Sequence, residues 1–224
     1  FLTPSTDAEY TYPHEIRFEV EKLVGKYILD VEGFRSEDKD AILRQIYEMA
    51  EKRFTIAGHF LASKPWDFFM MVEIGPDRLH HGFWKYMDPE HPKHEPGNRY
   101  QHAIRDYYRF LDAEIGKLLA AAGKDASVLV VSDHGACRMD GGICVNEWMI
   151  QQGYLALKEY PEKPARFSEL KIDWAKTKAW GEGGYYSRIF LNVQGREPQG
   201  VVPQKDYESF RDEVARKLEA IPDD

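Results

Sequence analysis

Two short apolar runs place the strongest constraint on how this chain folds. Residues 67–74 include an unbroken apolar run from Phe68 to Val72, and residues 127–132 are nearly all β-branched or apolar. Each run is too short for a buried helix, and its continuous apolar character is typical of a strand that is covered on both faces. We therefore predict two buried strands, over residues 67–74 and 127–132.

A helical pattern lies between these two strands. Apolar residues recur at helical spacing over residues 98–122, and Gly123 is expected to end that helix. A strand, a long crossover that contains a helix, and a second strand make a βαβ unit, which favours a parallel sheet. The predicted fold class is therefore α/β, with a mainly parallel sheet covered by helices on both faces.

The rest of the chain extends this prediction. Residues 1–64 read as a mostly helical lead-in, with helices over residues 14–28 and 36–62 and with Ser36 as the N-cap of the second. After the second strand we expect a short helix at residues 145–152, a strand at residues 185–193 and a last helix at residues 205–220. We predict that residues 1–224 are the central and C-terminal part of one α/β catalytic domain, with residues 65–224 as its core.

Charge and composition narrow the partners. The net charge of −8 repels a phosphate backbone, and we find no basic stripe with interleaved aromatic residues, so nucleic acid is not an expected partner. An anionic substrate then needs local cations, which are arginine, lysine or bound metal. The apolar run 66–74 is interrupted by Asp67 and Glu73 and is too short to cross a bilayer, so we expect no membrane partner.

Cysteine use and the first residue bear on the compartment and on completeness. The chain has two cysteines, whose spacing fits neither a disulfide framework nor a redox pair, and this favours a cytoplasmic protein. The chain begins with Phe1 rather than Met and carries no leader pattern, so we expect a piece of a longer polypeptide. The sequence does not specify an oligomeric state.

Each predicted strand is followed directly by a carboxylate and an imidazole. Asp77 and His81 follow the first strand, and Asp133 and His134 follow the second. Ligands of open α/β sheets bind at the carboxyl ends of the strands. If the chain is helical after the first strand, Asp77 and His81 stack on one helix face, with His80 pointing elsewhere. Carboxylate oxygen and imidazole nitrogen suit zinc, manganese or iron, so these four residues are our predicted metal ligands.

Alternatives exist for these and for neighbouring residues. Either Asp/His pair alone would also be typical of a helix cap or a solvated loop, whereas two pairs at the ends of two strands of one sheet are harder to explain by capping. The basic residues Arg78, Lys85 and Arg138 are near the motifs and either receive a phosphate oxygen or form ordinary surface ion pairs. A proline-rich loop carries His91 and His94, which either bind an ion or are simply solvated.

These motifs resemble the metal motifs of the alkaline phosphatase superfamily, specifically its type I phosphodiesterase/nucleotide pyrophosphatase branch. The resemblance is carried by Asp-x-x-x-His at residues 77–81 and Ser-Asp-His-Gly at residues 132–135. The neighbouring residues 66–69, 77–87 and 192–200 resemble a subgroup described as predicted phosphohydrolases or phosphomutases. The resemblance covers nearly the whole chain and implies an alkaline-phosphatase-like core that acts on a small-molecule phosphate ester.

The resemblance also implies a mechanism. Two divalent ions, zinc or manganese, are expected, with Asp77 and His81 on one ion and Asp133 and His134 on the other. A serine or threonine alkoxide between the ions would attack phosphorus to give a phospho-enzyme, while the ions lower its pKa and neutralise charge on the oxygens. Water, or a second hydroxyl in a mutase, would then take the phosphoryl group.

Two departures from the family pattern shape the functional prediction. The family's nucleophile and a further metal-binding Asp lie near the start of the domain, and no segment before Asp77 matches them; Thr3 and Ser5 lie in a proline-containing lead-in with no strand before it. The family also supplies a late histidine, but none follows His134. We therefore expect the central and C-terminal part of the domain, with the nucleophile upstream of Phe1 and no activity in this fragment. The alternative is a non-catalytic metal-binding or regulatory domain that keeps the fold without the chemistry.

Overall fold

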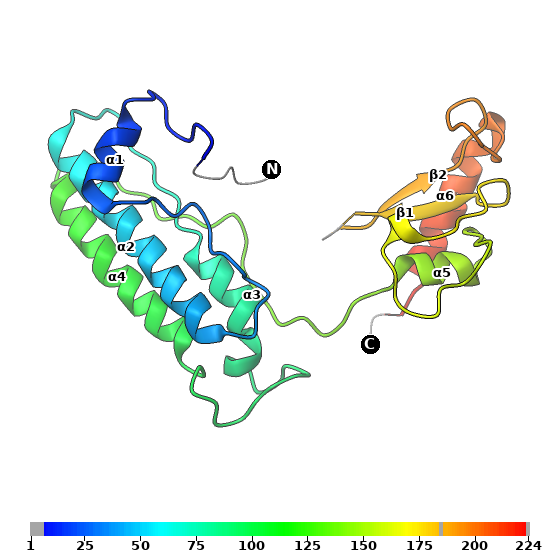
Figure 1. Ribbon diagram of the computed structural model, residues 1–224, viewed down its shortest axis with the longest axis horizontal. Helices are drawn as coiled ribbons and strands as arrows, with labels where there is room; N and C mark the ends of the chain where they lie inside the picture. Colours follow the sequence, from blue (N-terminus) through cyan, green and yellow to red (C-terminus); the bar gives the residue numbers. More distant parts are fainter. Residues whose placement is uncertain (1–6, 184–185, 223–224) are drawn as a thin grey trace. The chain divides into compact units, whose positions relative to one another are not determined.

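The structure is a computed structural model that describes residues 7–183 and 186–222, so Thr3 and Ser5 lie outside the described residues. The chain divides into two compact units, Phe1–Asp140 and Gly141–Asp224 (Figure 1). Each unit has its own hydrophobic core. Among the described residues, no helix combines the length and apolar character that a membrane span needs. The sequence analysis placed both units in one catalytic domain built around a mainly parallel sheet, and this stays a prediction.

The first unit is built from helices that pack against one another (Figure 1). They are α1 (Ile16–Val24), α2 (Lys39–Ser63), α3 (Gly75–Met87) and α4 (Ala103–Ala122). The inward face of α3 carries Leu79, Phe83 and Tyr86, which are buried against residues of α2 and α4. Because this face is turned inwards, the remaining sides of α3 are available for polar residues.

The ends of these helices test the predicted signals. The N-cap of α2 is Asp38, whose Oδ1 accepts a hydrogen bond from the Ala41 amide at 3.0 Å. The prediction of Ser36 as the cap was wrong, because its hydroxyl instead accepts a hydrogen bond from the Asp38 amide at 3.1 Å. Gly123 ends α4 with a positive φ of 83°, as the sequence predicted.

The two predicted buried strands are not formed in the structure. Residues 67–74 contribute only Ile74 to the start of α3, and neither they nor residues 127–132 pair as strands. The second run is exposed, to 88% at Leu129, whereas the first is exposed in part, to 77% at Phe68, with Met71 and Ile74 packed against the core of the first unit. A strand obtains its hydrogen bonds and its covered faces from neighbouring strands, and the described residues supply no such neighbour to either run. The expected mainly parallel sheet is therefore replaced, among the described residues, by one antiparallel pair in the second unit.

The second unit combines that pair with helices. Its elements are α5 (Val145–Gln151), η1 (Phe167–Glu169), β1 (Ala179–Glu182), β2 (Arg188–Leu191), η2 (Gln204–Asp206) and α6 (Tyr207–Glu219). The strands are antiparallel, with Ala179 opposite Leu191 and Glu182 opposite Arg188. The predicted helices at 145–152 and 205–220 are confirmed with shorter bounds, as α5 and α6. The predicted strand at 185–193 is confirmed as the shorter β2, and residue 185 lies outside the described residues. Strand β1 was not predicted because Gly181 interrupts its pattern.

A buried amide fixes the loop after β2. Asn192 is 1% exposed, and its Nδ2 lies 3.0, 2.8 and 2.9 Å from the backbone carbonyl oxygens of Trp174, Thr177 and Gln199, so its two N–H groups are shared among three acceptors. Trp174 and Thr177 belong to the turn at residues 173–177, and Gln199 belongs to a later loop, so a single side chain holds these two stretches of the second unit together. The segment 192–200, which contributes to the family resemblance, thus has a clear structural function.

We expect Asn192→Ala to destabilise the second unit by about 2–3 kcal/mol, because it leaves buried carbonyl groups without a donor. Urea unfolding followed by the circular dichroism of the neighbouring Trp174 and Trp180 rings would measure this. Gln194→Ala is the matched control, since Gln194 is exposed and should change stability by less than about 0.5 kcal/mol. Equal stability of the two variants would contradict the structural function of Asn192.

Candidate metal centre

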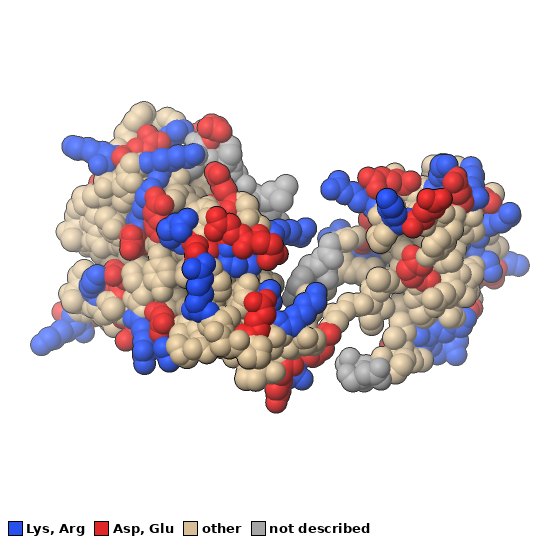
Figure 2. Space-filling view, turned by 60° about the horizontal axis from the view of Figure 1, so that its bottom comes forward, with Lys and Arg blue, Asp and Glu red and all other residues tan. Residues whose placement is uncertain are grey.

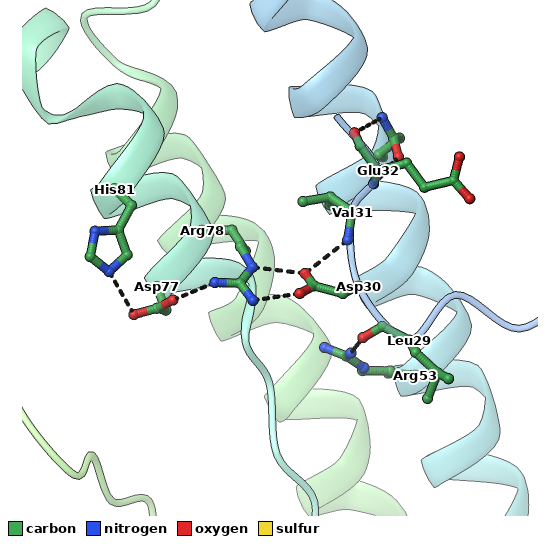
Figure 3. A network of polar contacts seen from close by, with 9 residues as sticks. Leu29, Asp30, Val31, Glu32, Arg53, Asp77, Arg78 and His81 are labelled. Atoms are coloured by element: carbon green, nitrogen blue, oxygen red, sulfur yellow. Dashed lines mark hydrogen bonds and ion pairs between the residues drawn. The ribbon is translucent and has the colours of Figure 1, made fainter. Parts of the chain in front are cut away.

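The first predicted ligand pair lies on α3. Proline is accepted in the first helical turn, where its missing amide hydrogen is not needed, and Pro76 occupies this place. Asp77 follows in the same turn and His81 one turn later, and Asp77 Oδ1 lies 3.4 Å from His81 Nε2 (Figure 3). The predicted helical stacking of these two side chains is confirmed, and about half of the His81 side chain is exposed.

His80 points elsewhere, as expected. Its ring stacks on Tyr108 and lies edge-on to Trp84, and Tyr108 Oη is 3.3 Å from His80 Nε2. Burial lowers the pKa of His80, although the Asp77 carboxylate acts in the opposite direction. His80 is therefore held by aromatic neighbours, away from the carboxylate that faces His81.

Arg78 orients the Asp77 carboxylate. Arg78 Nη1 donates to Asp77 Oδ2 at 3.0 Å, so the oxygen that faces His81 is the other one, Oδ1. The same guanidinium holds Asp30 with two hydrogen bonds, from Nε to Oδ1 at 2.7 Å and from Nη2 to Oδ2 at 2.5 Å. Figure 3 shows these contacts as a continuous row from Asp30 through Arg78 and Asp77 to His81. Such a fork is a rigid, charge-assisted contact, so the direction of Asp77 is fixed from one side.

The second predicted pair has fewer contacts with the rest of the unit. Asp133 and His134 follow the unpaired run 127–132, their side chains are 89% and 65% exposed, and Asp133 Oδ2 lies 3.7 Å from His134 Nε2. A hydrogen bond with the Gly135 carbonyl and the nearby Asp133 raise the pKa of His134. Among the described residues, the hydrogen bonds and the ion pair of these two residues all stay within residues 132–135.

The two pairs do not form one ligand shell among the described residues. The Asp77 carboxylate contributes to the raised pKa of His134, after the Gly135 carbonyl and Asp133. Yet in residues 7–183 and 186–222 no three or more His, Cys, Asp or Glu side chains are placed to hold a common ion. The structure thus brings together the members of each pair, and the joining of the two pairs stays a prediction.

The neighbouring basic candidates are engaged with carboxylates. Besides Arg78, Lys85 Nζ lies 2.6 Å from Glu95 Oε1, and Arg138 pairs with Glu90 and Asp140. On the face seen in Figure 2, acidic and basic side chains are likewise interspersed. In the structure these basic side chains form ordinary ion pairs and do not line a preformed phosphate pocket.

The loop histidines are tied to the backbone. His94 Nδ1 lies 2.9 Å from the Lys85 carbonyl oxygen, and His91 Nδ1 accepts a hydrogen bond from the Lys93 amide at 3.0 Å. This arrangement fits a folded loop better than a second ion site.

Two carboxylates next to the site were missed by the sequence reasoning. Asp30 comes from a loop far from Asp77 in the sequence, and no local pattern marks it. Glu73 had been read only as an interruption of an apolar run, yet its side chain is 12% exposed and lies just before α3. A charged residue inside an apolar run was the signal that could have revealed it.

Comparison with known proteins gives one match. A family model described as type I phosphodiesterase / nucleotide pyrophosphatase matches residues 1–224. No curated protein and no solved structure matched the chain.

We expect Arg78→Gln to raise the pKa of Asp30. Burial favours a higher pKa for this carboxyl, but hydrogen bonds from Arg78 and from the Val31 amide outweigh burial and hold the pKa below its usual value. A lowered pKa in the folded state stabilises the fold at pH values above the unfolded-state pKa, and this stabilisation is lost as the pH falls through the folded-state pKa. The variant should lose less stability over that acid range.

Carboxyl-detected NMR titration of Asp30 and urea unfolding at a series of acid pH values would measure both effects. Lys85→Gln, which breaks the separate pair with Glu95, is the control and should leave the Asp30 titration unchanged. An Asp30 midpoint that does not rise in Arg78→Gln would show that Arg78 does not hold this carboxylate.

Proposed function

Because the chain belongs to the type I phosphodiesterase / nucleotide pyrophosphatase family, we propose that it supplies metal ligands to a phosphoryl-transfer hydrolase that acts on a small-molecule phosphate ester. The observation that supports this most directly is the Asp77–His81 pair, which α3 presents on a partly exposed side with Oδ1 and Nε2 3.4 Å apart. The finer reading, hydrolase or phosphomutase, depends on whether water or a second hydroxyl takes the phosphoryl group.

The residues fit divalent metal in their chemistry. A carboxylate oxygen and an imidazole nitrogen on one helix side are the donor types that zinc and manganese accept. We propose that Asp77 and His81 hold one ion and that Asp133 and His134 hold a second. Bound ions of this kind neutralise charge on phosphate oxygens.

The chain's own contacts prepare the first pair for this role. Arg78 donates a hydrogen bond to Oδ2 of Asp77, and Oδ1 faces His81. The carboxylate is therefore oriented so that Oδ1 and the His81 nitrogen can bind the same ion. His80 is held by Tyr108 and Trp84 and does not compete for the same position.

Completion of a parallel sheet would bring the second pair to the first. Apolar side chains are exposed at Phe68, Met70 and Val72 of the first run and at residues 128–131 of the second, and covering such surface contributes about 25 cal/mol per Å². If both runs became strands of one parallel sheet, their carboxyl ends would meet at the same edge, and each run ends at its Asp/His pair. We therefore propose that the runs belong to a mainly parallel, alkaline-phosphatase-like sheet, with the nucleophilic serine or threonine on a segment upstream of Phe1.

The alternative is a non-catalytic metal-binding or regulatory domain. It shares the metal ligands with the enzyme and differs in turnover, so binding and catalysis need separate tests. Absence of nucleic acid among the partners and a cytoplasmic location also remain predictions.

We expect the chain to bind Mn²⁺ or Zn²⁺, and Asp77→Asn or His81→Ala to weaken binding by at least about 100-fold, since losing a ligand costs more than losing one of its outer partners. The double change Asp133→Ala with His134→Ala should remove the second ion. Isothermal titration calorimetry would measure the affinities and the stoichiometry. His91→Ala, a histidine of the proline-rich loop, is the control and should bind as the native chain does. A native chain that gives no heat above buffer would contradict the metal site.

Ester cleavage separates the enzyme from the alternative. We expect a polypeptide that joins this chain to an upstream nucleophile segment to release phenolate from an aryl phosphate monoester or diester in the presence of divalent metal. The 224-residue chain alone should release none. Chelation of the metal should abolish turnover, which absorbance of the phenolate would follow. Metal binding by the longer polypeptide without turnover of either ester would favour the non-catalytic domain.

A further inference from the structure

A buried carboxylate lies directly beneath the start of α3. Glu73 Oε1 accepts hydrogen bonds from the Gly75 amide at 2.6 Å and from Tyr107 Oη at 3.0 Å. Tyr107 belongs to α4 and is fully buried. The other oxygen of Glu73 pairs with Arg53 of α2, with Nη1 and Oε2 3.6 Å apart and both side chains 12% exposed. One carboxylate thus ties the beginning of α3 to both long helices of the unit.

The Glu73 side chain caps the N-terminus of α3. The N-cap position, Ile74, makes no side-chain cap hydrogen bond, so the first amide of the helix takes its acceptor from Glu73. A negative charge at this end also interacts favourably with the positive end of the helix dipole. Asp77 lies in the same first turn, so any shift of this turn moves the Asp77 carboxylate as well.

The contact at Gly75 leaves no room for a side chain. A Cβ atom at Gly75 would lie 1.9 Å from Tyr107 Oη and 2.6 Å from Glu73 Oε1. The backbone can approach the Tyr107 hydroxyl this closely only because residue 75 is glycine. The start of α3 is therefore seated against α4 through a defined polar contact rather than through apolar packing alone.

Arg53 links this contact to the other polar anchor of Asp77. Besides pairing with Glu73, Arg53 Nη2 donates to the Leu29 carbonyl at 2.8 Å (Figure 3). The next residue, Asp30, holds Arg78, which in turn holds Asp77. Asp77 is thus fixed along two routes, through the helix start at Glu73 and through the Asp30–Arg78 pair.

We infer that Glu73, held by Tyr107 and Arg53, is a positioning residue for the metal ligands Asp77 and His81. It touches neither ligand; it fixes the first turn of α3 and so the direction in which Asp77 presents its carboxylate. This inference rests on the proposed function, because the ligands belong to the metal site proposed there.

Tyr107→Phe tests the inference with the smallest change. It removes one hydroxyl and leaves the ring in the core, whereas Glu73→Ala would leave the largely buried Arg53 without its carboxylate partner and destabilise the whole unit. We expect the Gly75 amide to exchange about tenfold faster and the Mn²⁺ affinity of the Asp77–His81 pair to fall about tenfold. Amide hydrogen exchange by NMR and calorimetry with Mn²⁺ alone would measure the two quantities.

Tyr47→Phe is the matched control. The Tyr47 ring packs edge-on against Tyr107, with ring centres 5.0 Å apart, and among the described residues its hydroxyl makes no hydrogen bond. This variant should leave both quantities unchanged. Glu73→Gln keeps an acceptor oxygen near Gly75 but removes the charge that pairs with Arg53, so its Mn²⁺ affinity should fall at least as far as that of Tyr107→Phe.

The outcomes separate the two proposals. If Tyr107→Phe behaves as Tyr47→Phe does, or if Gly75 exchange rises while Mn²⁺ affinity stays at the native value, the positioning role is overturned and the proposed metal site stands. If the native chain binds no Mn²⁺, the metal site is overturned and the positioning role falls with it. Faster exchange together with weaker Mn²⁺ binding, confined to the Tyr107 and Glu73 variants, is the result that supports the inference.

Discussion

The packing of α3 against α2 and α4 determines what the first unit can present to a ligand. Leu79, Phe83 and Tyr86 turn one side of α3 into the core, and the helical repeat then places Asp77 and His81 together on another side. Helix packing thus places the first predicted ligand pair, and such preorganisation would reduce the cost of ordering the two side chains around an ion.

The second pair has no comparable support. Asp133 and His134 follow a run whose apolar side chains are exposed, and that run can become a strand only when other strands supply hydrogen bonds and cover its faces. If the two pairs share a site as proposed, metal binding would be coupled to sheet completion. Metal binding that orders this segment would draw on the same free energy that folds it.

Sequence reasoning succeeded where the interactions are local. The helices, the stop at Gly123 and the stacking of Asp77 on His81 follow from spacing along one segment. It failed where neighbours decide the outcome. Residues 67–74 and 127–132 have the composition of buried strands, but composition supplies no partner strand. Glu73 looked like an interruption in an apolar run because its partners, Arg53 and Tyr107, come from two distant helices.

Paramagnetic broadening by Mn²⁺ tests most directly whether the two pairs share a site. With isotope-labelled protein and substoichiometric Mn²⁺, the account predicts selective loss of the amide signals around both Asp77–His81 and Asp133–His134, and none around His91 and His94. Broadening at only one of the two pairs, or centred on the proline-rich loop, would contradict a common metal centre.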